Sequence, residues 1–254
     1  MKIFFLRAGL EGGLPAALPA GSAFACFGTF CVCRRNFDRG GRKHMKKRIV
    51  CFGDSNTWGY NALESSRYGE EIRWTGRLQR LLGEEYTVIE EAQNGRTTVW
   101  DDPIENRLAG LTYLWPCMES HSPFDLLIIM LGTNDTKLYF NVPARSIADG
   151  AGRLVRLAQQ SDYGIGNKAP KVLLISPVRI EESEIAGHIF GRQAAEKSRG
   201  FSQAYQEVAG EYGCYFLDAA RYAAPCEYDG VHLDEDGHKK LACAVYDKVK
   251  NILG

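Results

Sequence analysis

The stretch Asp125-Leu-Leu-Ile-Ile-Met-Leu131 is apolar at every position after its aspartate, and Gly132-Thr-Asn-Asp135 follows it directly. A strand with one face in water alternates apolar and polar residues, whereas a strand covered by helices on both faces is apolar throughout. Lys171-Val-Leu-Leu-Ile-Ser176 has nearly the same continuous pattern. We therefore expect both stretches to be central strands of a parallel sheet with helices on both of its faces.

Three further short apolar runs complete the pattern expected for such a sheet, at 48–53, 86–90 and 214–218. Longer amphipathic stretches lie along the chain between and after these runs, and their apolar residues recur at helical spacing. We expect helices over 74–82, 147–157, 194–212 and 237–252. The alternation predicts the α/β class, with a single three-layer α/β/α sandwich built around a five-stranded parallel sheet.

The composition of the 254 residues is that of a globular protein. The hydrophobic fraction of 45% and the charged fraction of 24% exclude a mainly disordered, collagenous or highly charged chain. The 31 basic and 31 acidic residues balance, so the chain lacks the basic excess that is typical of nucleic-acid binding. No run reaches the ~18 apolar residues of a membrane span. We expect neither nucleic acid nor a membrane as a partner.

The first 44 residues differ in character from the rest of the chain. They contain seven basic and two acidic residues, and their net charge of +5 cancels the −5 of residues 45–254. Gly, Ala and Pro are frequent in this segment, and no helical or strand periodicity is sustained. We expect 1–44 to be a disordered or non-native N-terminal extension, and 45–254 to be the folded domain.

A signal peptide is the alternative interpretation of this segment. Lys2 and Arg7 could form its charged region, and Ala23-Phe-Ala25 resembles a cleavage site. Glu11, two glycines and two prolines interrupt the apolar stretch that such a peptide requires. We therefore expect a cytoplasmic protein, with export as the alternative.

Polar segments follow the predicted strands, at the edge of the sheet where parallel α/β proteins bind their ligands. Taken singly, each has a simple structural explanation as a helix cap or a turn, and an Asp three residues before a His also arises by chance. The four segments are Gly53-Asp-Ser-Asn-Thr-Trp-Gly59, Gln93-Asn-Gly-Arg-Thr-Thr98, Gly132-Thr-Asn-Asp135 and Tyr228-Asp-Gly-Val-His-Leu233.

Together the four segments supply every group that nucleophilic acyl transfer requires. Ser55 brings a hydroxyl to the start of a helix, and His232 brings a base. Asp229 can hold the imidazole in one orientation and tautomer. The backbone N–H groups of Ser55 and Gly95 and the side-chain amide of Asn134 can stabilise an oxyanion. The combination predicts a serine hydrolase.

In their order and spacing, these segments resemble those of the SGNH (GDSL-type) hydrolase family. The resemblance extends from about residue 47 to residue 252. Three further stretches resemble the bacterial arylesterase/acyltransferase branch, namely Arg73-Trp-Thr-Gly76, Gly95-Arg-Thr-Thr98 followed by Asp101-Asp-Pro103, and Ile129-Met-Leu-Gly-Thr-Asn-Asp-Thr-Lys137.

The resemblance implies a flavodoxin-like SGNH hydrolase fold and a role for each matching residue. Ser55 is the expected nucleophile, His232 the general base and acid, and Asp229 the carboxylate that orients the imidazole. Ser55, Gly95 and Asn134 are the expected oxyanion hole. The implied reaction is hydrolysis of short-chain aryl or alkyl esters through an acyl-enzyme, with acyl transfer to alcohols as a further activity. The family also implies a small-molecule ester substrate, no metal, no cofactor and a homo-oligomer.

Two residues next to the expected nucleophile depart from the family pattern. Asn56 stands where the family often has an apolar residue, and Tyr60 where some arylesterase-like members have Trp. With Trp58 they are the candidates for the substrate pocket. Their polarity leaves a carbohydrate esterase that removes acetyl groups from sugars as an alternative. A non-catalytic binding module is a third reading, which the complete set of catalytic groups disfavours.

Two other features bear on the site. His238 is the nearest rival to His232, but we expect it to lie inside the last helix, and it lacks an aspartate three residues before it. The long connection 180–197 follows a predicted central strand and can overhang the site, where it would help to select substrates.

Overall fold

In the computed structural model, which describes residues 45–254, a five-stranded parallel sheet lies at the centre of the fold. The predicted extension 1–44 lies outside the described residues. The strand order is β4-β1-β5-β6-β7, the flavodoxin-like order, and it places β5 and β6 inside the sheet as expected. The strands are β1 (Lys47–Gly53), β4 (Tyr86–Ala92), β5 (Leu126–Met130), β6 (Lys171–Ser176) and β7 (Tyr215–Asp218).

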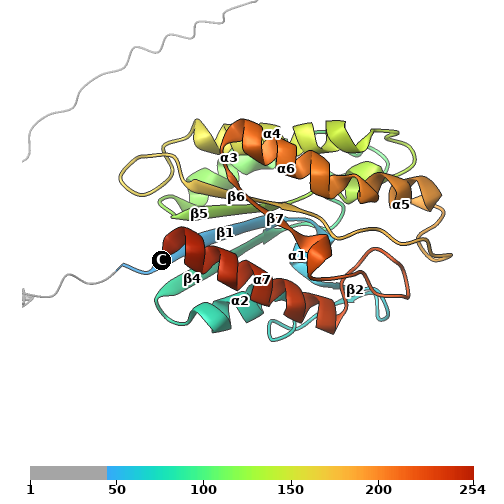
Figure 1. The fold of residues 1–254 in the computed structure, drawn as a ribbon, viewed down its shortest axis with the longest axis horizontal. Helices are drawn as coiled ribbons and strands as arrows, with labels where there is room; N and C mark the ends of the chain where they lie inside the picture. Colours follow the sequence, from blue (N-terminus) through green and yellow to red (C-terminus); the bar gives the residue numbers. More distant parts are fainter. Residues whose placement is uncertain (1–44) are drawn as a thin grey trace, which may run out of the picture. The chain divides into compact units, whose positions relative to one another are not determined.

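Helices cover both faces of the sheet and form the predicted three-layer sandwich (Figure 1). On one face lie α2 (Trp74–Leu82) and α7 (Glu235–Leu253). The other face is covered by α3 (Gly110–His121), α4 (Ala144–Gln159) and α6 (Phe201–Tyr212). The shorter elements are α1 (Ser55–Trp58), β2 (Tyr60–Asn61), β3 (Ser66–Arg67), η1 (Asn134–Thr136), α5 (Gly191–Arg199) and η2 (Ala219–Arg221).

The core is divided between the two faces of the sheet because successive side chains of a strand point in opposite directions. In β5, Ile128 packs toward α2 and α7, whereas Ile129 packs toward α3, α4 and α6. Both are fully buried, and burying such a side chain contributes about 1.5–3 kcal/mol to stability. The continuous apolar pattern of this strand therefore follows from its having no exposed face.

Two helical regions differ from the sequence-based expectation. The single helix expected over 194–212 is instead two helices, α5 and α6, which meet at Gly200. Helix α3 was not predicted because Pro116 lies in its interior, where proline removes a backbone N–H and normally interrupts a helix. Both differences lie on the α3, α4 and α6 side of the sheet, and neither changes the layer order.

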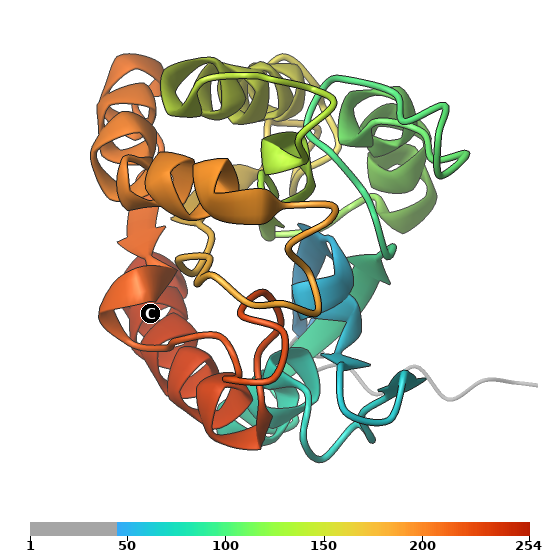
Figure 2. The same ribbon diagram turned by 90° about the vertical axis from the view of Figure 1, so that its right-hand side faces the viewer.

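The carboxyl ends of the strands meet at one edge of the sheet, where α1 and β2 also lie. This edge faces the viewer in Figure 2. Gly53, at the end of β1, permits a close return of the chain, since a Cβ there would lie 2.1 Å from Thr57 Oγ1. Among residues 45–254, no helix is long and apolar enough to cross a membrane.

Candidate active site

Ser55 is the first residue of α1, as the sequence predicts. Asp54 caps this helix: its Oδ1 accepts a hydrogen bond from the Asn56 backbone N–H at 3.0 Å. Burial raises the pKa of Asp54 to about 6, although the hydrogen bond from Asn56 and the charge of His232 act in the opposite direction. The Asp54 carboxylate thus holds the turn that presents Ser55 at the start of the helix.

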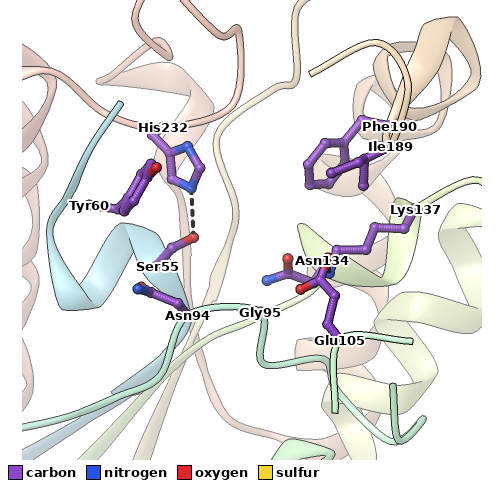
Figure 3. A pocket seen from close by; sticks show the side chains of 10 residues that line it. All are labelled: Ser55, Tyr60, Asn94, Gly95, Glu105, Asn134, Lys137, Ile189, Phe190 and His232. Atoms are coloured by element: carbon purple, nitrogen blue, oxygen red, sulfur yellow. Dashed lines mark hydrogen bonds and ion pairs between the residues drawn. The ribbon is translucent and has the colours of Figure 1, made fainter. Parts of the chain in front are cut away.

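Ser55, His232 and Asp229 form a continuous chain of hydrogen bonds (Figure 3 shows the first). The Ser55 Oγ lies 2.9 Å from His232 Nε2, and His232 Nδ1 lies 2.5 Å from Asp229 Oδ2. The second oxygen of Asp229 accepts the backbone N–H groups of Val231 and His232 at 2.9 and 3.0 Å. The structure thus brings together three residues that the sequence places up to 177 positions apart.

The environment of Asp229 keeps it ionised. Burial alone would raise the pKa of this carboxyl, but the hydrogen bond and charge of His232, with the backbone N–H groups, outweigh burial and hold the pKa well below its usual range. An ionised Asp229 keeps the His232 proton on Nδ1, so that Nε2 faces Ser55 as an acceptor.

The segments that follow three strands, β1, β4 and β5, bring Ser55, Gly95 and Asn134 to the lining of one cavity (Figure 3). Gly95, after β4, has a φ of +78°, a conformation that favours glycine. Asn134 begins η1 after β5, and its Nδ2 donates one hydrogen bond to the Arg96 carbonyl at 3.1 Å. The amide has a second N–H, and Asn134 lines the same cavity as Ser55 and Gly95. The arrangement can stabilise a negative oxygen next to the serine.

The serine opens into a cavity of about 200 Å³ with walls of different character. One wall is apolar, from Ile189 and Phe190, and another carries Lys137 and Glu105, whose charged groups lie 2.6 Å apart. The Tyr60 ring centroid is 4.6 Å from that of His232. The cavity is lined by Ser55, Tyr60, Asn94, Gly95, Glu105, Asn134, Lys137, Ile189, Phe190 and His232.

Of the three predicted pocket residues, only Tyr60 lines this cavity. Asn56 is buried, and its amide bonds to backbone groups of the loop that carries His232. The ring of Trp58 stacks instead against the Arg67 guanidinium, at 4.8 Å. The structure therefore corrects the prediction for these two residues, because contacts with other segments hold both side chains outside the cavity lining.

Sequence reasoning missed the lining residues Glu105, Lys137, Ile189 and Phe190. Partial signals existed for some of them. Lys137 lies three residues after Asn134, at the residue that caps the end of η1. Ile189 and Phe190 belong to the connection 180–197, which was expected to overhang the site, and this expectation agrees with their position in the cavity wall.

Two other histidines, His238 and His121, have partners of their own. His238 lies inside α7, fully buried, and its Nδ1 accepts the Trp74 backbone N–H at 3.3 Å. Burial, aided by the charges of Arg77 and Arg73, lowers the pKa of His238 to about 3. His121 Nε2 lies 2.5 Å from Glu91 Oε1. Neither imidazole lines the cavity around Ser55.

Glu91, His121 and the Cys117 thiol place possible metal-binding atoms within 4.8 Å of one another. The guanidinium of Arg96 lies near this group, and one of its nitrogens donates to the Glu91 carbonyl at 2.6 Å. Burial raises the pKa of Cys117 to about 12, so the sulfur is a protonated thiol. The neighbouring positive charge of Arg96 disfavours a bound cation at this group.

Comparison with known proteins places this geometry in a family. Residues 51–240 match the GDSL-like lipase/acylhydrolase family, which is most of the chain. The chain belongs to this family and is a carboxylic ester hydrolase. No curated protein sequence matches the chain.

Solved structures with a similar fold include esterases of two kinds. The native aryl esterase of M. smegmatis is 38% identical with a TM-score of 0.78, and the match covers 82% of this chain and 100% of that chain. Est24, a carbohydrate acetylesterase from Sinorhizobium meliloti, is 39% identical with a TM-score of 0.77 and the same coverage. A putative arylesterase from Agrobacterium tumefaciens is 32% identical with a TM-score of 0.76, covering 82% and 100% of the two chains.

Proposed function

We propose that the protein is a serine esterase that hydrolyses short-chain carboxylic esters through an acyl-enzyme on Ser55. The observation that carries this proposal is the hydrogen-bonded chain from the Ser55 Oγ through His232 to Asp229, open to a small cavity. The cavity, about 200 Å³ in volume, suits a short acyl group together with part of the alcohol. The family and the similar esterases support the same reaction class.

Acylation follows from the geometry. As the Ser55 Oγ attacks the ester carbonyl carbon, His232 Nε2 accepts the hydroxyl proton. The carbonyl oxygen becomes an oxyanion that accepts hydrogen bonds from the backbone N–H groups of Ser55 and Gly95 and from the Asn134 amide. His232 then donates its proton to the leaving alcohol, and the carbon–oxygen bond to that alcohol breaks.

Deacylation repeats these steps with a new nucleophile. Water enters the site of the departed alcohol, gives a proton to His232 and attacks the acyl-enzyme, which releases the acid and restores Ser55. An alcohol in the same place would accept the acyl group instead, so acyl transfer is a further activity within this proposal. The partly apolar mouth, with Ile189 and Phe190, can hold such an alcohol.

A second candidate, deacetylation of carbohydrates, is favoured by the charged wall of the cavity. Glu105 is partly exposed there and offers carboxylate oxygens to hydroxyl groups, while the buried Lys137 ammonium pairs with Glu105 and Asp102 and holds the carboxylate in place. The apolar wall opposite favours an aryl or alkyl alcohol. The two candidates share the acyl-enzyme and differ in the alcohol that they release.

A panel of esters tests the proposal and separates the candidates. We expect kcat/KM for p-nitrophenyl esters to be highest for acetate and to fall toward octanoate, because the cavity is small. Acetylated monosaccharides, assayed by acetate release, report the second candidate. Phe190→Ala should enlarge the cavity and raise octanoate hydrolysis relative to acetate. A wild-type enzyme that prefers octanoate, or that hydrolyses no ester, would contradict the proposed chain-length preference or the proposed reaction.

Asn134→Ala is expected to lower kcat for p-nitrophenyl acetate by about 100- to 1,000-fold, with little change in KM. The amide stabilises a charge that appears only in the transition state, so its loss affects the chemical step more than substrate binding. Asn134→Asp is the matched variant, since a carboxylate of the same shape repels the oxyanion and should lose more activity than Ala. Equal or higher activity of the Asp variant would remove Asn134 from the oxyanion hole.

A further inference from the structure

The side chain of Asn56 joins the nucleophile turn to the loop that carries His232. Its Nδ2 donates to the Val231 carbonyl at 3.2 Å, and its Oδ1 accepts the Leu233 backbone N–H at 2.9 Å. The residue is 3% exposed, so water competes little for these hydrogen bonds. The two partners are the residues immediately before and after His232.

The backbone of Asn56, which is part of the nucleophile turn, is also held by a hydrogen bond. Its backbone N–H donates to Asp54 Oδ1 at 3.0 Å, and its neighbour Ser55 begins the same helix. A rigid connection therefore runs from the backbone beside the nucleophile to the backbone beside the base. This connection spans 177 positions of sequence, the same separation as that between Ser55 and His232.

Other hydrogen bonds hold the histidine loop, but they run to different parts of the molecule. The Gly230 carbonyl accepts from the Glu181 backbone N–H at 2.8 Å, and the Asp229 carbonyl accepts from Ser183 Oγ at 2.6 Å. Within residues 45–254, the hydrogen bonds between α1 and this loop are the pair made by Asn56 and the Ser55–His232 bond itself. Asp229 orients the imidazole within its own loop but does not fix that loop relative to α1.

We infer that Asn56 is a positioning residue that sets the distance between the Ser55 hydroxyl and the His232 imidazole. It does not line the cavity and so makes no contact with substrate. The inference rests on the proposed roles of Ser55 and His232. Asn56 departs from the family pattern at the position after the nucleophile, and the inference gives this departure a function. That function is the positioning of His232 and not the substrate contact that the sequence predicted.

Asn56→Leu removes both hydrogen bonds and nearly preserves the shape of the side chain. We expect kcat for p-nitrophenyl acetate to fall about 10- to 100-fold, with KM changed less than about threefold, because small errors in catalytic geometry slow chemistry strongly. Asn56→Ala leaves room for water to satisfy the freed backbone groups and should fold even where the Leu variant does not. The same loss of kcat is expected for it.

Gln79→Leu is the matched control. The Gln79 amide also bridges two backbone segments, since it accepts the Val88 N–H at 2.8 Å and donates to the Gly83 and Tyr86 carbonyls at 3.1 and 3.2 Å. These bonds join α2 to β4 and lie outside the cavity lining. This variant should lose thermal stability but keep the wild-type kcat. An equal loss of kcat in both Leu variants would reduce Asn56 to a structural residue and overturn the inference.

A spectroscopic measurement separates this inference from the proposed reaction. The ¹⁵N resonance of His232 Nε2 reports its hydrogen bond to Ser55, and Ser55→Ala defines the position of that resonance when the bond is absent. Asn56→Leu and Asn56→Ala should move the resonance toward this position, whereas Gln79→Leu should not. A resonance that stays at the wild-type position in the folded Asn56 variants would overturn the inference, whatever the esterase activity of the wild type.

Discussion

Ser55→Ala is expected to reduce kcat for p-nitrophenyl acetate by about 10⁴- to 10⁶-fold. The variant has no side-chain oxygen to form the acyl-enzyme. His232 Nε2, which lies 2.9 Å from Ser55 Oγ in the wild type, then has no nucleophile to activate. The oxyanion donors remain, and they should leave a small rate above that of the uncatalysed reaction. Steady-state hydrolysis measures the loss of kcat. The initial burst of p-nitrophenol measures the loss of acyl-enzyme formation.

The control for this prediction is Ser161→Ala. Ser161 is also a buried serine, and its Oγ donates to the Ala158 carbonyl at 2.8 Å at the end of α4, outside the cavity lining. Its replacement should leave kcat unchanged. If Ser55→Ala kept more than about a hundredth of the wild-type kcat, the acyl-enzyme mechanism would be abandoned, because loss of a serine nucleophile costs far more.

The sequence predicted the sheet and the catalytic groups for related physical reasons. A strand buried on both faces must be apolar at every position, and 126–130 therefore stands out without any knowledge of its partners. The end of such a strand is also where a parallel sheet binds ligands, so polar groups after it are informative. Ser55, Gly95 and Asn134 all follow strands in this way, and the structure places them around one cavity.

The remaining features depend on contacts between distant segments. Asn56 has the same sequence context whether its amide faces a substrate or the backbone of residues 231 and 233, and only the folded chain distinguishes these cases. Phe190 lies in an irregular connection with no period to indicate its direction. The path of α3 depends on tertiary packing that tolerates Pro116. Local pattern therefore predicted the strands, most of the helices and the candidate reacting groups, while the walls of the cavity depend on tertiary structure.

Asp229→Asn is expected to lower kcat by about 10⁴-fold, even though the amide has nearly the shape of the carboxylate. The carboxylate oxygen 2.5 Å from His232 Nδ1 can only accept, which leaves Nε2 free to take the Ser55 proton. An amide N–H facing Nδ1 would instead favour a proton on Nε2, where it blocks the base, and the imidazolium formed during reaction would lose its counter-charge. Asp218→Asn is the matched control, because that buried carboxylate bonds to Ser176 and Ala220 outside the cavity.

Asp229→Asn should also change the stability of the protein in a pH-dependent way, and the sign of this change follows from the lowered pKa of the Asp229 carboxyl. The pKa of Asp229 is lowered on folding, so ionised Asp229 stabilises the native state above its unfolded pKa, and this contribution is lost as the pH falls toward the folded value. The difference in Tm between wild type and Asp229→Asn should therefore be largest near neutral pH and should shrink below about pH 4. A difference that grew on acidification would mean that the carboxylate is not held ionised by His232. The role of Asp229 in orienting the imidazole would then lose its electrostatic basis.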